Sequence, residues 1–143
     1  MAPDTQTCVK VNDEWGVVNA RQLGRDLAKQ LGFGSVDQAR ITTAISEVAR
    51  NIYLYAPGGQ ICIEIVKQPG QTGLKMIASD NGPGIQDIRK AMEDGYTTSG
   101  GLGAGLPGVK RLMDEFTIRS DEGEGTEITA MKWLRPTAGT VIP

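Results

Sequence analysis

Apolar residues recur at the three- and four-residue spacing of amphipathic helices in two adjoining stretches of the chain. The first runs from about Glu14 to Gln30, with Asp13 as its predicted N-cap and Gly32 as its end. The second begins at Ser35, which forms a capping-box pattern with Gln38, and continues to a Pro-Gly-Gly segment. The apolar positions are Trp15, Val18, Leu23, Leu27 and Leu31 in the first stretch and Ile41, Ile45, Val48, Ile52 and Tyr55 in the second. Each stretch therefore predicts a helix that buries one side.

Alternating apolar and polar residues predict strands elsewhere in the chain. The expected strands are residues 7–12, 60–67, 74–79, 117–120 and 126–134, and further helices are expected over 85–93 and 106–116. This order predicts an α+β two-layer sandwich, with helices on one face of a mixed, mostly antiparallel sheet. We expect a single domain over residues 1–135 and a frayed C-terminal tail over 136–143.

Composition excludes several kinds of function. The 143 residues suffice for one well-buried core, and 15 basic against 17 acidic residues give a net charge of −2 without a basic block. Binding to nucleic acid is therefore disfavoured. No run approaches the roughly 20 apolar residues of a membrane helix, so we expect no membrane association and a cytoplasmic location. The absence of histidine excludes Ser-His nucleophiles and phosphohistidine chemistry.

The two cysteines, Cys8 and Cys62, are far apart and lack metal-ligand spacing. We expect two reduced thiols, with a disulfide as the alternative.

Glu47 and Asn51 are four residues apart, so they are neighbours on one side of the second helix. That side differs from the apolar stripe, and the pair should therefore face a cleft or the solvent. A carboxylate beside an amide oxygen suits Mg²⁺, which prefers oxygen ligands and brings phosphates with it. The alternative is a solvated helix face.

Asp80 ends an expected strand and precedes Gly82 and Gly84. A carboxylate at a strand end can accept a hydrogen bond from an exocyclic amine, and glycines allow close approach of a flat ring. An ordinary Asp-Asn-Gly turn is the alternative.

A glycine-rich segment directly before the last expected helix is suited to hold phosphates through backbone N–H groups. It contains Gly101, Leu102, Gly103, Ala104 and Gly105, followed by Leu106, and Thr98 and Ser99 precede it as part of an expected lid. It lacks the Gly-Lys-Ser/Thr ending of a Walker loop. A flexible surface loop is the alternative.

Taken in order, these three segments resemble the N, G1 and G2 boxes of the GHKL ATPases. One branch of this family is resembled closely by three segments of the chain: DQARITTAISEVARNIYLYA, DNGPGI and TTSGGLGAGLPGVKRLMDEF. This branch is the anti-sigma-type serine/threonine kinases, in particular the RsbT-type switch kinases of the stressosome. The resemblance covers nearly the whole chain, from about Val9 to Arg135, and independently implies the same two-layer fold.

The resemblance implies roles for the site residues. Asn51 is the expected Mg²⁺ ligand, Glu47 the general base, and Asp80 the residue that binds the adenine amine, which makes ATP the expected nucleotide. Gly125-Thr126 resembles the small terminal Gly-Thr element of the family, and Thr126 is expected either beside the adenine or in a plain strand turn. Arg50 could steady a phosphate or form an ion pair.

The resemblance also implies protein partners. We expect a kinase that phosphorylates STAS-domain proteins and, once released, activates a PP2C-type phosphatase regulator. The alternative is a non-catalytic, ATP-gated partner-switching protein. A stand-alone ATPase is disfavoured by the small size of the chain. Arg21, on the polar side of the first helix, is a candidate docking contact or a solvated charge.

Overall fold

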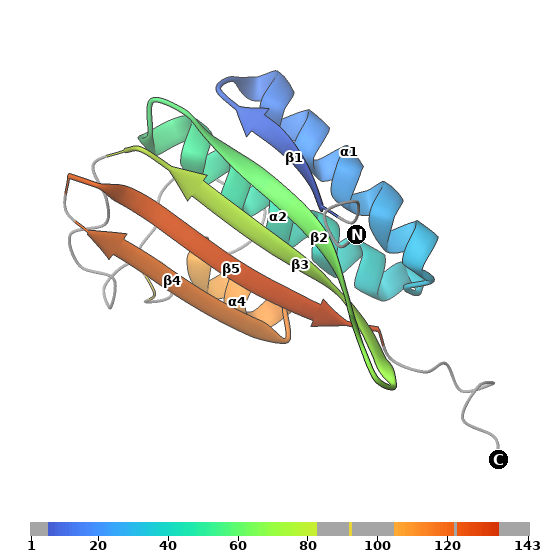
Figure 1. Cartoon of the computed structure of the whole chain (residues 1–143). Coiled ribbons are helices and arrows are strands. Elements are labelled where there is room, and N and C mark those ends of the chain that lie inside the picture. Colours follow the sequence, from blue (N-terminus) through green and yellow to red (C-terminus); the bar gives the residue numbers. More distant parts are fainter. Residues whose placement is uncertain (1–5, 83–91, 93–104, 122, 135–143) are drawn as a thin grey trace, which may run out of the picture.

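A computed structural model of the chain describes residues 6–82, 92, 105–121 and 123–134. These residues form two layers, a five-stranded sheet and a layer of helices that covers one of its faces (Figure 1). The strands are β1 (Gln6–Val11), β2 (Gly59–Gln68), β3 (Gln71–Asp80), β4 (Glu115–Asp121) and β5 (Gly125–Trp133). They are arranged in the order β1-β2-β3-β5-β4, and every neighbouring pair is antiparallel. The predicted α+β sandwich is confirmed.

Helix α1 (Glu14–Leu31) begins and ends as the sequence predicts. The Asp13 side chain accepts a hydrogen bond of 3.0 Å from the backbone N–H of Gly16, which satisfies one donor of the first turn. Gly32 closes the helix with a φ of 96°, a conformation that favours glycine.

Helix α2 (Ser35–Tyr55) starts differently from the prediction. Gly34 is the N-cap and makes no side-chain capping bond, so the predicted capping box of Ser35 and Gln38 is wrong. Ser35 already lies inside the first turn, and Gln38 Nε2 instead donates to the carbonyl oxygen of Phe33 at 2.7 Å. The side chain of Gln38 thus fixes the preceding loop rather than the cap.

The core lies between the helices and the sheet. The predicted stripe of α2 is buried at Ile41, Ile45, Val48 and Ile52, and each such side chain contributes roughly 1.5–3 kcal/mol through burial. Trp15 and Tyr55 were wrongly assigned to the core, because they are 72% and 55% exposed. Helix α1 packs mainly through small or β-branched residues: Gly16, Val17, Ala20, Gly24 and Ala28. A Cβ at Gly16 would collide with the backbone of Lys10 and Val11, so the close approach of α1 to β1 requires glycine at this position.

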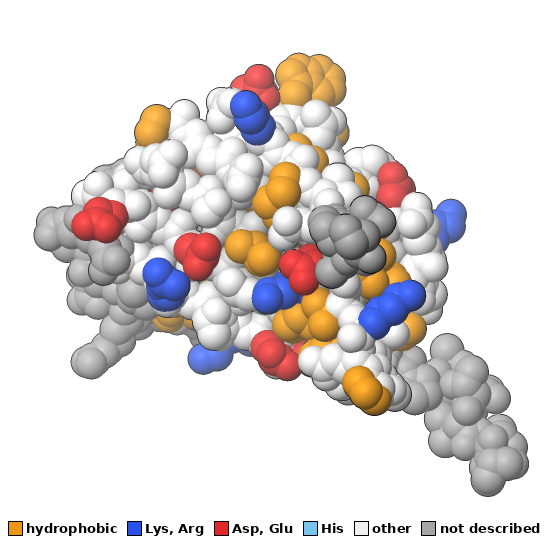
Figure 2. Space-filling view, viewed as in Figure 1, with side chains coloured by type: hydrophobic (Ala, Val, Ile, Leu, Met, Phe, Trp, Pro, Cys, Tyr) orange, Lys and Arg blue, Asp and Glu red, His pale blue; other side chains and the backbone are white. Residues whose placement is uncertain are grey.

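The other face of the sheet has no described helix over it. Figure 2 views this face and shows acidic and basic side chains interspersed with hydrophobic ones, without a large patch of one sign. An example is Arg119 on β4, 3.8 Å from the carboxylate of Glu127 on β5. Both side chains are largely exposed, so this pair contributes little to stability.

Cys8 and Cys62 form a disulfide across β1 and β2, which overturns the expectation of two reduced thiols. The two residues are 54 positions apart in sequence but directly opposite in the antiparallel register. Cross-strand neighbours of this kind have closely spaced side chains. The sequence could not reveal the pairing, because the register of β1 on β2 is not visible in the spacing of the cysteines.

Helix α4 (Leu106–Leu112) is shorter than the predicted segment 106–116. Met113 is its C-cap, and the backbone N–H of Asp114 donates to the carbonyl of Met131 at 2.8 Å, which directs the chain into β4. Phe116 therefore belongs to a strand, where it pairs with Ala130. Apart from residue 92, the expected helix over 85–93 lies outside the residues that the structure describes, and so does the expected tail.

Lys132 on β5 is buried, at 4% exposure, and joins three elements. Its Nζ donates to the carbonyl oxygen of Leu112 at 2.8 Å and lies 3.7 Å from the carboxylate of Asp37 and 3.8 Å from that of Asp114. The sheet, the first turn of α2 and the end of α4 are thereby held together. None of the described helices is both long and apolar enough to cross a membrane.

Candidate nucleotide site

Helix α2 carries Glu47 and Asn51 one turn apart, as the four-residue spacing predicts. Glu47 is 4% exposed and Asn51 is half-buried. A solvated helix face is therefore excluded for Glu47. Burying a carboxylate is costly, and a protein retains such a group where specific interactions or chemistry require it.

Asp80 is the last residue of β3 and lies on the sheet face that meets the helices. Leu74, Met76 and Ala78 alternate with half-buried positions on the same strand and are buried in the core, and Asp80 continues this series. Its Oδ1 accepts a hydrogen bond of 2.8 Å from the backbone N–H of Gly82. The side chain therefore takes part in a local turn, and this bond fixes the orientation of the carboxylate at the strand end.

The end of α2 is packed directly against the end of β3. A Cβ added to Gly82 would lie 2.9 Å from the Cβ of Ala56, the residue that caps α2. A Cβ added to Gly59, at the start of β2, would lie 2.9 Å from the Cβ of Asp80 and 3.0 Å from the side chain of Ile52. The last turns of the helix that carries Asn51 and the strand end that carries Asp80 are thus brought together.

Thr126 on β5 is directly opposite Asp80 in the sheet register. Its hydroxyl lies 2.8 Å from the hydroxyl of Ser120, which also donates to the carbonyl of Gly125 at 3.0 Å. The sequence predicted Thr126 as a candidate but missed Ser120. Ser120 pairs with Thr126 across β4 and β5, in a register that the sequence alone does not specify.

Gly125 allows β5 to begin against the end of β3. Its φ is 98°, and a Cβ would collide with the carbonyl oxygen of Asp80. Both the conformation and the contact therefore require glycine at this position. The close fit keeps Asp80 and Thr126 at a fixed separation.

The last residue of the glycine-rich segment, Gly105, leads directly into α4. Gly105 is the N-cap of α4 with a φ of 72°, and both Gly105 and Leu106 are buried. Helix α4 packs against α2. The remaining predicted residues of the glycine-containing segments, Gly84, Thr98, Ser99, Gly101, Leu102, Gly103 and Ala104, lie outside the described residues.

A hollow of about 460 Å³ opens beside Asp80, where the ends of β1, β2 and β3 meet. Its lining is largely polar and consists of Lys10, Asn12, Pro57, Gly58, Gly59, Gln60, Ser79, Asp80 and Asn81. The two arginines of uncertain role differ in burial. Arg50 is half-buried on α2, whereas Arg21 is exposed on α1. In the described parts of the chain, no three His, Cys, Asp or Glu side chains form a group able to hold a metal ion on their own.

The family model described as "Histidine kinase-, DNA gyrase B-, and HSP90-like ATPase" matches residues 36–136. This match spans α2, the sheet from β2 onward and every segment of the candidate site. The chain belongs to this family and, like its members, uses ATP.

Relatives within the family define the branch. The serine/threonine-protein kinase RsbT of Bacillus subtilis is 72% identical over 130 residues, which cover 91% of this chain and 98% of RsbT. The anti-sigma F factor of a Thermoanaerobacter species is 31% identical over 121 residues, covering 80% of this chain and 83% of that protein. The chain is thus a serine/threonine protein kinase, and its function is that of an ATP-dependent partner-switching kinase.

Solved structures agree with the fold. A Mycobacterium tuberculosis protein with RsbU and RsbW domains matches with a TM-score of 0.59 and 19% identity, over 92% of this chain and 34% of that longer one. The mycobacterial sensor histidine kinase MprB matches with a TM-score of 0.52 and 17% identity, over 92% of this chain and 99% of MprB. At these identities the likeness concerns the fold alone.

Proposed function

We propose that this kinase transfers the γ-phosphate of ATP, bound with Mg²⁺, to a serine or threonine of a STAS-domain protein. The observation that carries the proposal is the buried Glu47 one turn from Asn51, on a helix whose end contacts the Asp80 turn. The 72% identity to RsbT over almost all of that protein supports the same conclusion.

Glu47 acts as the general base in this proposal. A carboxylate held in a protein interior can accept the proton of an acceptor hydroxyl as the oxygen attacks phosphorus. The Asn51 amide oxygen, one turn further on, is the protein ligand for Mg²⁺. An oxygen ligand fits this ion, which is often held by few protein groups together with substrate phosphates. When bound, the metal neutralises charge on the phosphates.

The nucleotide is held at both ends. Asp80 accepts a hydrogen bond from the adenine amine, with Gly82, Gly84 and Thr126 forming the surroundings of the base. The triphosphate is covered by the segment that contains Thr98, Ser99, Gly101, Leu102, Gly103, Ala104, Gly105 and Leu106. Backbone N–H groups of such a segment can donate to phosphate oxygens without side-chain interference.

Partner switching follows from the same site. We propose that the kinase is held by its STAS-domain substrates, is released when it has phosphorylated them, and then binds and activates a PP2C-type phosphatase regulator. The anti-sigma F factor relatives are named for acting on a partner, which supports a second candidate, in which ATP gates the binding of partners.

The two candidates are separated by one measurement. The purified chain is mixed with a STAS-domain protein and γ-labelled ATP, with Mg²⁺ in one sample and a chelator in the other. Label on a serine or threonine of the STAS protein, present only with Mg²⁺, is the expected result. Binding of the STAS protein without any transfer of label would favour the gating function instead.

A further inference from the structure

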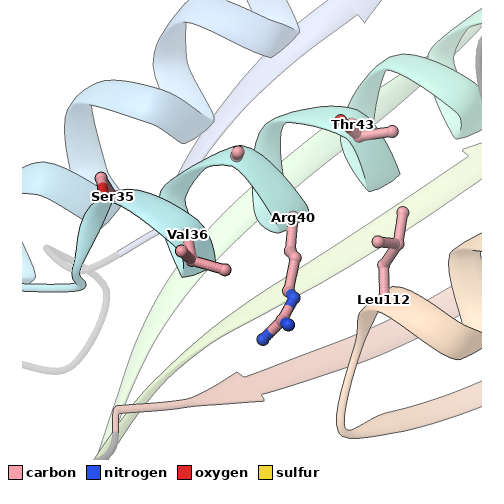
Figure 3. A pocket seen from close by; sticks show the side chains of 6 residues that line it. Ser35, Val36, Arg40, Thr43 and Leu112 are labelled. Atoms are coloured by element: carbon pink, nitrogen blue, oxygen red, sulfur yellow. The ribbon is translucent and has the colours of Figure 1, made fainter.

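A second hollow, of about 450 Å³, lies between the N-terminal half of α2 and the end of α4, separate from the nucleotide-site residues (Figure 3). It is lined by Ser35, Val36, Ala39, Arg40, Thr43 and Leu112. Val36 is 60% exposed, although a valine of this kind is normally buried. Together with Ala39 and Leu112 it provides an apolar surface of the size of one side chain.

The walls of this hollow are held in place by the buried Lys132 and by an ion pair of Arg40 with Asp37. The carbonyl oxygen of Leu112 accepts a hydrogen bond from Lys132, and Asp37 lies within ion-pair distance of both Lys132 and Arg40. The Arg40 to Asp37 distance is 3.0 Å. Helices α2 and α4 therefore keep a fixed separation, and the hollow is preformed rather than opened by a ligand.

Arg40 is the charged side chain among the residues that line the hollow. Arg40 on α2 and Lys110 and Arg111 on α4 are exposed, and Figure 3 shows Arg40 extending from α2 toward α4. The nearby acids Asp37 and Asp114 are largely buried, at 17% and 16% exposure, and both lie near Lys132; Asp37 also pairs with Arg40 at 3.0 Å, which leaves the rest of that guanidinium open to a further acidic group. A partner that offers an acidic residue beside an apolar one would match this arrangement.

The hollow shares one side of α2 with the proposed general base. Val36, Arg40, Thr43 and Glu47 follow one another at spacings of four, three and four residues, which keep them on the same side of a helix. Thr43 precedes Glu47 by one turn, or about 6 Å along the axis. A protein whose hydroxyl reaches Glu47 would therefore pass over the hollow.

We propose that this hollow docks the phosphoacceptor protein by receiving an apolar side chain that is flanked by an aspartate or glutamate. The proposal rests on the proposed kinase function and assigns to Val36 and Arg40 the recognition of its substrate. The apolar side chain fills the space over Ala39 and Leu112, and the acidic residue meets the guanidinium of Arg40.

Two charge substitutions test the docking surface by steady-state kinetics with a purified STAS-domain protein. Val36→Glu and Arg40→Glu are each expected to raise the KM for the STAS protein about tenfold or more, the size of effect found at interface hot spots. The maximal rate and the affinity for ATP should stay within about twofold of the unmodified chain. Arg119→Glu is the matched control for Arg40→Glu, because it makes the same charge change at an 85% exposed side chain on β4. Unchanged KM values for both test variants would overturn the proposal.

A cross-linking experiment decides the question even if no phosphate is transferred. A photoreactive benzoyl-phenylalanine is placed at position 36, with position 119 as control, and the chain is irradiated with the STAS protein. Cross-links from position 36 alone to the STAS protein are expected. Products that join two copies of this chain, or none at all, would reject the hollow as the docking site. Absence of phosphate transfer by the unmodified chain would instead reject the proposed function.

Discussion

Glu47 and Lys132 are both charged and both 4% exposed, yet the roles that we propose for them differ. Lys132 is surrounded by oxygens of Leu112, Asp37 and Asp114, which come from α4, α2 and the connection between α4 and β4. Glu47 instead lies one turn from Asn51, on the half of α2 whose end packs against Asp80. Burial alone therefore does not distinguish a structural charge from a chemical one.

The surroundings make the distinction. A buried charge costs free energy unless partners compensate it, and the partners of Lys132 tie separate elements of the fold together. On α2, Glu47 lies between the hollow at Val36 and Asn51, the proposed metal ligand. We infer that Lys132 maintains the separation of α2 and α4, whereas Glu47 remains the proposed general base.

The largest expected effect is on phosphate transfer. Glu47→Ala should lower the single-turnover rate to a STAS-domain protein about 10²–10⁴-fold, the usual contribution of a general base, with near-normal ATP affinity. Asn51→Ala should lose Mg²⁺-dependent ATP binding as well. Phosphate transfer at the full rate by Glu47→Ala would reject Glu47 as the general base.

Removing the structural charge should affect stability instead. Lys132→Met leaves Asp37 and Asp114 without their shared cation, and we expect the free energy of unfolding to fall by about 3 kcal/mol in urea titrations. ATP affinity of the folded variant, measured at low temperature, should change little. Lys67→Met on β2, where the lysine is exposed, is the control and should shift stability by less than about 0.5 kcal/mol. Equal effects of the two substitutions would contradict the structural role of Lys132.

A smaller effect is expected at the nucleotide base. Asp80→Asn should weaken ATP binding by about 1–3 kcal/mol, because an amide can direct a donor at the adenine amine. The asparagine oxygen can still accept the hydrogen bond from Gly82, so the turn should persist. Calorimetry measures the affinity, and unfolding in urea checks the fold. Unchanged ATP affinity would remove Asp80 from the adenine pocket.

The smallest effect on stability is expected for Trp15, a large and exposed side chain. Trp15→Ala should change the free energy of unfolding by less than about 0.5 kcal/mol, because the indole is 72% exposed. Ile45→Val, which removes one methylene group from a fully buried residue, should cost about 0.5–1.5 kcal/mol. If the tryptophan change were the more costly of the two, the assignment of Trp15 to the surface would be wrong.

The sequence predicted those features that depend on local spacing. The bounds of α1, the buried stripe of α2 from Ile41 to Ile52, and the adjacency of Glu47 and Asn51 all follow from helical periodicity. The strand that ends at Asp80 follows from alternation. The family resemblance added the expected roles of these residues, which spacing alone could not assign.

The features that the sequence missed depend on contacts between distant segments. Trp15 has the spacing of a core residue, but small residues on α1 bring that helix so close to α2 that another side of it is buried. Helix α4 ends early because pairing with β5 draws Phe116 into a strand. The position of Ser120 beside Thr126 likewise depends on a register that no local pattern specifies.

The disulfide between Cys8 and Cys62 encloses a covalent ring that contains both α1 and α2. Without it, bringing β1 beside β2 requires closing a loop of 54 residues, and such closures are entropically unfavourable and slow folding. With it, the edge strand is tethered to its neighbour even in the unfolded chain. The half of the protein that carries Glu47 and Asn51 would then search far fewer arrangements than the half that carries β3, β4 and β5. Oxidation of one pair of cysteines thus lowers the conformational entropy of one half of the unfolded domain and not of the other.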